Sequence, residues 1–202
     1  MPHHNPRETM FGMVSRPERY ERMTTGPFRR VHARVVADVA AAGLGSGVRV
    51  LDVGTGPGGV PLAIARARPL LRVDGLDLSA DMIAYARQAT VNAGLDDRLA
   101  FTVGDVAELP YPDGTFDLVV SSMSQHHWGD VRTAIREIRR VLRPGGQAWI
   151  YDARIALHRA STAAREEAGA RGATAAPVRT GRLPIRLVGR LVFAAAPALA
   201  SA

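Results

Sequence analysis

Glycines at positions 54, 56, 58 and 59 form the stretch of the sequence best suited to hold a nucleotide-like ligand. The run before them, Val48 to Val53, has the apolar, β-branched composition of a parallel strand that is covered on both faces. The glycines allow a tight turn whose backbone can approach a ligand closely. The apolar pattern that follows predicts a helix whose N-terminal amides point toward the same ligand.

Asp52, near the end of this predicted strand, decides which ligand the turn favours. The spacing of Gly54, Gly56 and Gly59 matches the fingerprint of dinucleotide-binding proteins. However, a carboxylate at this position would repel the pyrophosphate of a dinucleotide. A ligand with a cationic end and no phosphate is therefore favoured, and an NAD-type oxidoreductase is the alternative.

Later predicted strands also carry acidic residues at or near their ends. Arg72–Leu78 contains Asp77, where a carboxylate can accept hydrogen bonds from both hydroxyls of a ribose. Leu99–Asp105 ends in the acidic residue Asp105. Two more predicted strands are Phe116–Ser122 and Gln147–Asp152.

The motif from Asp52 to Gly58, acidic-x-Gly-x-Gly-x-Gly, and the order of these strands resemble the class I S-adenosylmethionine-dependent methyltransferases. The resemblance covers residues 16 to 153 and is greatest for the small-molecule, methyltransferase type 11-like branch, which includes ubiquinone-biosynthesis-type enzymes. It implies S-adenosylmethionine as cofactor and a small organic molecule as methyl acceptor. The cofactor's ammonium and sulfonium groups would explain the acid at position 52. A cofactor-binding protein without catalysis is a further alternative.

The resemblance also implies roles for single residues around the cofactor. Asp77 would hold the ribose, Asp105 would accept from the exocyclic amine of adenine, and Met82 would lie against the adenine ring. Tyr20, on a predicted N-terminal helix, matches a tyrosine that binds the methionyl carboxylate. The alternatives are core packing for Met82, packing on the sheet edge for Tyr20 and a structural role in the turn for Asp105. The full implied cofactor set is Tyr20, Asp52, Gly54, Gly56, Asp77, Leu78, Met82, Gly104, Asp105, Val106 and Ser121.

The loop from Ser121 to Trp128 holds the adjacent residues His126 and His127, which are the candidate catalytic residues. Methyl transfer from a sulfonium is an in-line displacement that mainly needs aligned reactants. An oxygen or carbon nucleophile can also need a base, and a histidine suits that role. A structural hydrogen bond is the alternative for both residues. Adjacent side chains of an extended segment point to opposite sides, so one ring is expected to face the pocket and the other to orient the loop.

The elements that position these residues alternate between strands and helices. The pattern predicts a doubly wound, Rossmann-like α/β fold with a mainly parallel sheet, helices on both faces and a closing C-terminal antiparallel hairpin. The expected helices are Phe28–Ala42, a helix capped by Ser79 that runs to about Asn92, a helix that starts at Asp130, and Arg154–Gly172. The hairpin is expected over Pro177–Phe193, with Pro184 at its turn or on an edge. The expected domain organisation is a mobile tail over 1–15, one methyltransferase domain over 16–193 and a small-residue tail over 194–202.

Composition and charge limit the possible functions. The 202 residues suit one domain, and the lack of cysteine excludes disulfides and thiolate chemistry. No metal site is proposed, and only sites built from histidine or carboxylate side chains stay open as an alternative. All 26 basic residues are arginine and the net charge is +7, yet residues 31–153 carry 12 arginines and 14 acids. A nucleic-acid substrate is therefore disfavoured. Neither a signal peptide nor a membrane span is expected, and a cytoplasmic location is predicted.

Overall fold

A mixed sheet runs through the described part of the chain. The computed structural model describes residues 27–167, 173–178 and 187–195. The strands are β1 (Arg49–Val53), β2 (Arg72–Asp77), β3 (Leu99–Val103), β4 (Phe116–Ser122), β5 (Leu142–Ala153), β6 (Thr174–Pro177) and β7 (Val188–Ala194). Their spatial order is β3-β2-β1-β4-β5-β7-β6. β1 to β5 are parallel and β7 is antiparallel to both its neighbours, which confirms the predicted sheet and its antiparallel C-terminal pair.

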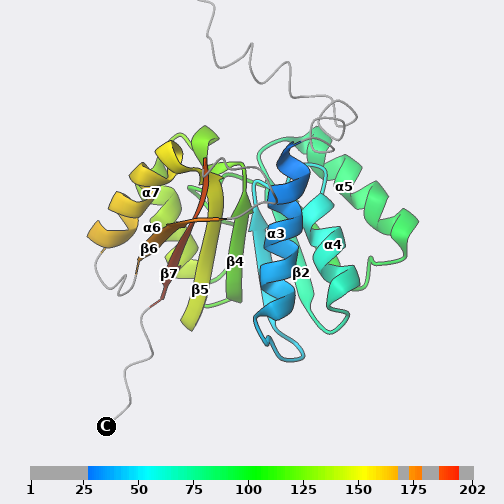
Figure 1. Cartoon of the computed structure of the whole chain (residues 1–202). Coiled ribbons are helices and arrows are strands. Elements are labelled where there is room, and N and C mark those ends of the chain that lie inside the picture. The colour runs from blue at the N-terminus through cyan, green and yellow to red at the C-terminus, as the bar shows by residue number, and fades with distance from the viewer. Residues whose placement is uncertain (1–26, 168–172, 179–186, 196–202) are drawn as a thin grey trace, which may run out of the picture.

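Helices cover both faces of this sheet (Figure 1). They are α3 (Pro27–Ala41), α4 (Gly59–Ala67), α5 (Ala80–Ala93), α6 (Val131–Val141) and α7 (Arg154–Glu166). One buried apolar cluster joins the sheet to α3, α4 and α5, and a second joins it to α6 and α7. The prediction of helices on both faces is confirmed.

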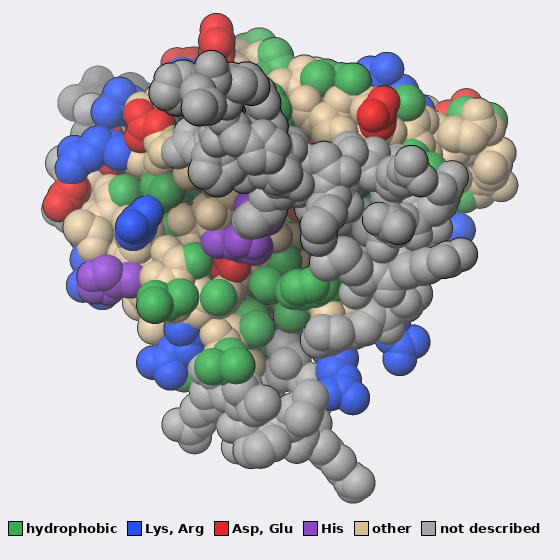
Figure 2. Space-filling view, turned by 90° about the horizontal axis from the view of Figure 1, so that it is seen from above, with side chains coloured by type: hydrophobic (Ala, Val, Ile, Leu, Met, Phe, Trp, Pro, Cys, Tyr) green, Lys and Arg blue, Asp and Glu red, His purple; other side chains and the backbone are tan. Residues whose placement is uncertain are grey.

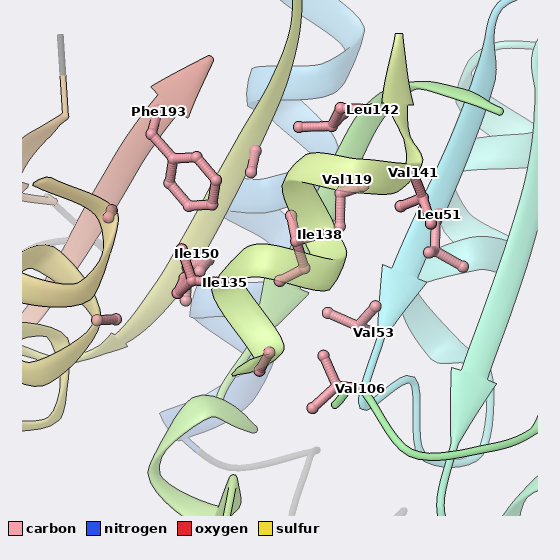
Figure 3. Close-up of a cluster of buried hydrophobic side chains, with 14 of the residues drawn as sticks. Leu51, Val53, Val106, Val119, Ile135, Ile138, Val141, Leu142, Ile150 and Phe193 are labelled. Carbon is pink, nitrogen blue, oxygen red and sulfur yellow. The ribbon is translucent and has the colours of Figure 1, made fainter. Parts of the chain in front are cut away.

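Helix α6 shows how the sequence pattern produces this packing. Asp130 caps the helix, since its Oδ1 accepts the backbone N–H of Thr133 at 3.0 Å. Ile135 and Ile138 are fully buried, and Figure 3 shows them among side chains from β1, β4, β5 and β7. Burying each of these side chains stabilises the fold by about 1.5–3 kcal/mol. The helix therefore fixes the strands that carry the site.

The strand order reverses between β1 and β4, because β2 and β3 lie on one side of this pair and β5 and β7 on the other. Open α/β sheets bind ligands outside the carboxyl ends of their strands at such a switch point. The loop over residues 42–48, blue at the bottom of Figure 1, leads into β1. The carboxyl ends of the parallel strands consequently lie at the top of that view.

Three predicted boundaries were wrong by three residues or more. β5 begins at Leu142 rather than Gln147, because Leu142 already pairs with Phe116 and the chain bulges before pairing resumes at Gln147. Pro177 ends β6 instead of starting the hairpin, and it pairs with Gly189 at the strand's end, where a residue without an N–H is tolerated. Helix α7 ends at Glu166, well before the predicted end at residue 172, because the backbone of Glu167 is no longer helical.

Other predictions fall on residues that the structure does not describe. These are Tyr20, Pro184, the N-terminal tail over 1–15 and residues 196–202 of the C-terminal tail. The domain boundaries stay a prediction. Within the described segments, no helix has the combined length and apolarity needed to cross a bilayer.

Candidate functional site

The glycine turn after β1 has the backbone geometry that its sequence predicts. Gly54, Gly56 and Gly58 have φ values of 71°, 53° and 81°, which side chains rarely adopt. A Cβ built on Gly54 would also lie 2.3 Å from the Cβ of Ser124, in the loop after β4. Glycine is therefore required at position 54 both for the turn and for the close contact between two loops.

Asp52 lies buried beneath this turn, with 2% of its surface exposed. Its Oδ2 accepts a hydrogen bond from Thr55 Oγ1 at 2.8 Å, whereas Oδ1 has no partner among the described residues. Burial raises the pKa of Asp52 to about 7, the Thr55 hydrogen bond opposes this rise, and the negative charge of Asp77 adds to it. A buried carboxyl oxygen without a partner suits a cationic ligand group.

Asp77, at the end of β2, ties the turn to the sheet. Its Oδ2 accepts the backbone N–H of Gly56 at 2.8 Å and its Oδ1 accepts that of Ser79 at 2.9 Å. Burial raises the pKa of this carboxyl, and the N–H groups of Ser79 and Gly56 counteract the rise. The two oxygens of the Asp77 carboxylate offer about four acceptor sites, so the carboxylate can accept further hydrogen bonds beyond these two. Its binding of the ribose hydroxyls stays a prediction.

Asp105, beyond the end of β3, is exposed and forms a turn. Its Oδ1 accepts the backbone N–H of Ala107 at 2.8 Å, which gives the structural alternative direct support. Gly104 packs closely, since a Cβ there would lie 3.0 Å from Leu76 Cδ1. Contact of Asp105 with adenine stays a prediction.

The remaining predicted cofactor residues differ in exposure. Leu78 is 56% exposed, so it can cover part of a ligand. Met82 is 3% exposed and Val106 is 8% exposed, and Val106 belongs to the apolar cluster beneath α6 and α7. The burial of Met82 agrees with the alternative of core packing.

The loop after β4 connects the two halves of the site through hydroxyl groups. Ser121 Oγ and Ser124 Oγ share a hydrogen bond of 2.8 Å, and Ser124 Oγ donates to the carbonyl of Val53 at 3.1 Å. Trp128 Nε1 donates to Ser124 Oγ at 3.3 Å. Met123 has a φ of 56°, which is unusual for a residue other than glycine and marks local backbone strain.

His126 is held by Asp152 at the end of β5. Its Nδ1 lies 2.9 Å from Asp152 Oδ1, and its backbone N–H donates to Asp152 Oδ2 at 3.1 Å. Asp152 is fully buried, and its hydrogen bond raises the pKa of His126, against the effect of burial. A carboxylate at Nδ1 selects the tautomer with a proton on Nδ1, which leaves Nε2 able to accept one.

His127 lies beside His126, because the segment Gln125–His127 is a 3₁₀ turn rather than an extended chain. The ring centroids are 4.0 Å apart, so the prediction that the two rings point to opposite sides was wrong. Burial and the charge of His126 lower the pKa of His127, while Asp152 and Asp77 oppose this change. Figure 2, which looks onto the carboxyl edge, shows histidine side chains near the centre of this face.

Buried polar atoms without partners gather at this edge. Six such side-chain atoms occur among the described residues, and three of them belong to Asp52, Ser122 and Gln125, at the ends of β1 and β4. Each unpaired group costs about 1–3 kcal/mol, which a ligand with matching groups would recover. The described residues contain no group of three His, Asp or Glu side chains that could hold a metal ion.

The sequence pattern did not reveal the roles of Asp152, Ser124 and Thr55. Asp152 is the last residue but one of β5, close to the strand end that Asp77 occupies in β2, and that similar position was the available signal. Ser124 and Thr55 carried no comparable signal, since their contacts depend on how the loops fold. Tyr20 lies outside the described residues, so its role stays a prediction.

Comparison with known proteins agrees with this geometry. A family profile described as "Methyltransferase domain" matches residues 51–150. The 27-O-demethylrifamycin SV methyltransferase of Amycolatopsis mediterranei is 39% identical over 54% of this chain and 40% of its own length. The fatty-acid O-methyltransferase of Mycolicibacterium smegmatis is 41% identical over 54% of this chain and 38% of its own length.

A solved structure extends the likeness to nearly the whole chain. A protein of Methanococcus maripaludis, described as a putative S-adenosyl-L-methionine-dependent methyltransferase, superposes with a TM-score of 0.76 at 20% identity. The superposition covers 92% of this chain and 94% of that one, which shows a shared fold. The matching segment spans less than half the length of the two curated relatives. Because the methyltransferase-domain profile matches residues 51–150, and the glycine turn and the acids at the strand ends agree with it, the chain belongs to the class I S-adenosylmethionine-dependent methyltransferase family.

Proposed function

We propose that this protein transfers a methyl group from S-adenosylmethionine to an oxygen atom of a small organic acceptor. The observation that carries the proposal is the pair of His126 and Asp152 at the same strand edge as the buried carboxyl of Asp52. His126, held by Asp152, can remove a proton from an acceptor, and the carboxyl of Asp52 can bind a cation. The acceptor's identity and a cytoplasmic location are part of the proposal.

The family cofactor fits the residues around the glycine turn. The free Oδ1 of Asp52 is suited to the cofactor's positive charge, and the remaining acceptor capacity of Asp77 is suited to the ribose hydroxyls. An NAD-type ligand would place a pyrophosphate near Asp52, which disfavours that alternative. We also propose that Asp105 accepts a hydrogen bond from adenine through the oxygen that does not bind Ala107.

The acceptor side supplies a base. When bound, S-adenosylmethionine provides an electrophilic methyl group on a sulfonium that leaves as a neutral thioether. His126 Nε2 takes the proton of an acceptor hydroxyl as the oxygen–methyl bond forms and the sulfur–methyl bond breaks. The buried Asp152 orients the ring and stabilises the imidazolium that results. One relative is itself named a fatty-acid O-methyltransferase, which supports an oxygen acceptor.

Binding and turnover test this proposal separately. Calorimetry should show micromolar affinity for S-adenosylmethionine or S-adenosylhomocysteine, equivalent to about 8 kcal/mol, and none for NADH. Acceptor screening with isotopically labelled cofactor should then reveal a methylated hydroxyl compound. If neither cofactor form binds the folded protein, the proposal fails. Binding without turnover of any acceptor would instead favour a cofactor-binding protein without catalysis.

A further inference from the structure

A cavity lies away from the cofactor turn, between α7 and the strands β6 and β7. Its volume is about 220 Å³, enough for a small functional group and part of a chain. The α7 side of its wall is polar and consists of Arg154, His158, Ser161, Thr162 and Arg165, together with the apolar Leu157. None of the described residues that line the cavity is acidic.

The positive charge of this wall is not neutralised by the rest of the described chain. Neither Arg154 nor Arg165 makes an ion pair with a described residue. The acids of the same helix region, Glu166 and Glu167, are instead paired with arginines of α6. The cavity is consequently electropositive.

Ser161 gives an independent sign of a ligand. It is 8% exposed, and its Oγ has no hydrogen-bond partner among the described residues. Thr162 beside it satisfies its hydroxyl within the helix, by donating to the carbonyl of His158 at 3.1 Å. Ser161 therefore offers an unused donor in an electropositive cavity, where an anionic acceptor of hydrogen bonds would fit.

The inner end of the cavity adjoins the proposed base. Gly189, which lines the cavity, is the residue of β7 that pairs with Asp152. Arg154 follows Asp152 by two residues, and α7 packs against the turn that carries His126. Arg154 and Ser161 are seven positions apart in the sequence, which is about 10 Å along a helix.

We propose that this cavity binds an acidic group of the methyl acceptor. This inference rests on the proposed function. The acceptor is then an elongated hydroxy acid. Its carboxylate or phosphate binds Ser161 and Arg165, and its hydroxyl lies beyond the Arg154 end of the cavity, about 10 Å or more from Ser161, next to His126. Arg154 lies along the path between these ends and favours the same negative charge.

Direct binding tests the site without turnover. Octanoate and inorganic phosphate, at matched ionic strength, are titrated by calorimetry into the whole chain and into Ser161→Ala, Arg165→Gln and Arg159→Gln. Arg159 lies on the same helix but does not line the cavity, so its variant controls for diffuse charge. The first two variants should weaken anion binding at least tenfold, and the control less than twofold. The tighter of the two probes identifies the acid as carboxylate or phosphate.

Stability and cofactor affinity show whether each variant stays folded and keeps its cofactor turn. Ser161→Ala should unfold at the same or a higher temperature, because it removes an unpaired buried hydroxyl, and all variants should bind S-adenosylhomocysteine as the wild type does. The proposal is overturned if neither anion binds, or if Arg159→Gln weakens binding as much as Arg165→Gln.

An acceptor panel completes the test. Hydroxyoctanoate and other hydroxy acids are compared with their neutral methyl esters, using labelled cofactor. The free acids should have at least tenfold lower KM values, and this advantage should shrink in Arg165→Gln. Methylation of neutral acceptors only would overturn the acidic acceptor but leave the proposed function standing. Failure of S-adenosylhomocysteine to bind would instead remove the proposed function, whatever the anions do.

Discussion

The two halves of the carboxyl edge are built by different kinds of contact. On the side of β1 and β2, Asp52 accepts a hydrogen bond from Thr55, three residues away, and Asp77 accepts one from Ser79, two residues away; a single longer-range hydrogen bond joins Asp77 to Gly56 across 21 residues. On the side of β4 and β5, His126 and Asp152 hold each other across 26 residues. Two of the three contacts in the first half are therefore local in sequence, whereas the contact in the second half depends on the pairing of two strands.

Substitutions that affect only one half test this difference. The largest effect is expected for Asp152→Asn, which keeps the shape of the side chain but removes the charge that orients His126. The methyl-transfer rate should fall about 10²- to 10⁴-fold, the range of general-base catalysis. Single-turnover kinetics on the identified acceptor measure this change, and calorimetry should show unaltered cofactor affinity.

The pH dependence of the same variant gives a second readout. Asp152 raises the pKa of His126, and only neutral imidazole accepts a proton. The wild-type rate should therefore rise with pH through a value above the ordinary ~6.5, and Asp152→Asn should move that midpoint to lower pH. An unchanged profile would show that His126 is not the base.

In the cofactor half, Asp52 should make stability depend on pH. Burial raises its pKa to about 7, so its contribution to stability is complete below the unfolded pKa of ~3.9 and is lost as pH rises through about 7. The shift of about three units corresponds to about 4 kcal/mol in all, of which about 3 kcal/mol is lost between pH 5 and pH 8. Urea unfolding at pH 5 and at pH 8, without cofactor, measures this loss of stability. Asp52→Asn should abolish most of the difference between the two pH values. A wild-type stability that is equal at both values would refute the buried, unpaired carboxyl.

Gly54→Ala tests the contact between the two halves. A side chain at position 54 suffers both the positive φ and the approach of Ser124, and together these should lower the unfolding free energy by about 3 kcal/mol. Gly43→Ala is the matched control, because Gly43 has a φ of 65° and no atom within 4 Å of a built Cβ. The control should lose only about 1 kcal/mol. Equal losses in thermal or urea unfolding would mean that the loops do not touch as described.

The sequence was informative where a residue's role follows from its own segment. Asp52 within β1, the glycines after this strand, the Ser79 cap of α5 and the left-handed Gly94 after that helix are local features. The structure confirms the helix between Ser79 and Gly94. The hydrogen bond between His126 and Asp152 depends instead on the register of β4 with β5, in which Ser122 pairs with Tyr151. No short-range pattern contains that information.

Errors in the prediction have the same origin. The two histidine rings were placed on opposite sides because the segment was assumed to be extended, whereas its backbone forms a 3₁₀ turn. The position of β6 was misjudged because an edge strand of four exposed residues, Thr174–Pro177, lacks the apolar alternation that signals a strand. Strand β6 exists because these residues pair with β7.

The smallest effect is expected for Asp105, where the cofactor and structural roles compete. Asp105→Asn keeps an acceptor oxygen for the N–H of Ala107, whereas Asp105→Ala removes it, so only the alanine variant should lose about 1 kcal/mol of stability. If Asp105 also binds adenine, the alanine variant should weaken cofactor binding more than the asparagine variant, by about tenfold. Equal cofactor affinities in both variants and the wild type would leave the turn as its only role.

The approach of Gly54 to Ser124 also constrains how this site can change over evolutionary time. A Cβ atom at position 54 would lie 2.3 Å from both the Cβ and the Oγ of Ser124 and would overlap them. The Cα of Ser124 is 3.8 Å from the same Cβ, which is an ordinary contact. Glycine at position 124 would therefore make room for alanine at position 54, at the expense of the Ser124 hydrogen bonds. The two positions must mutate as a pair, with the loss at 124 first, so a lineage that retains Ser124 keeps the first glycine of its cofactor turn.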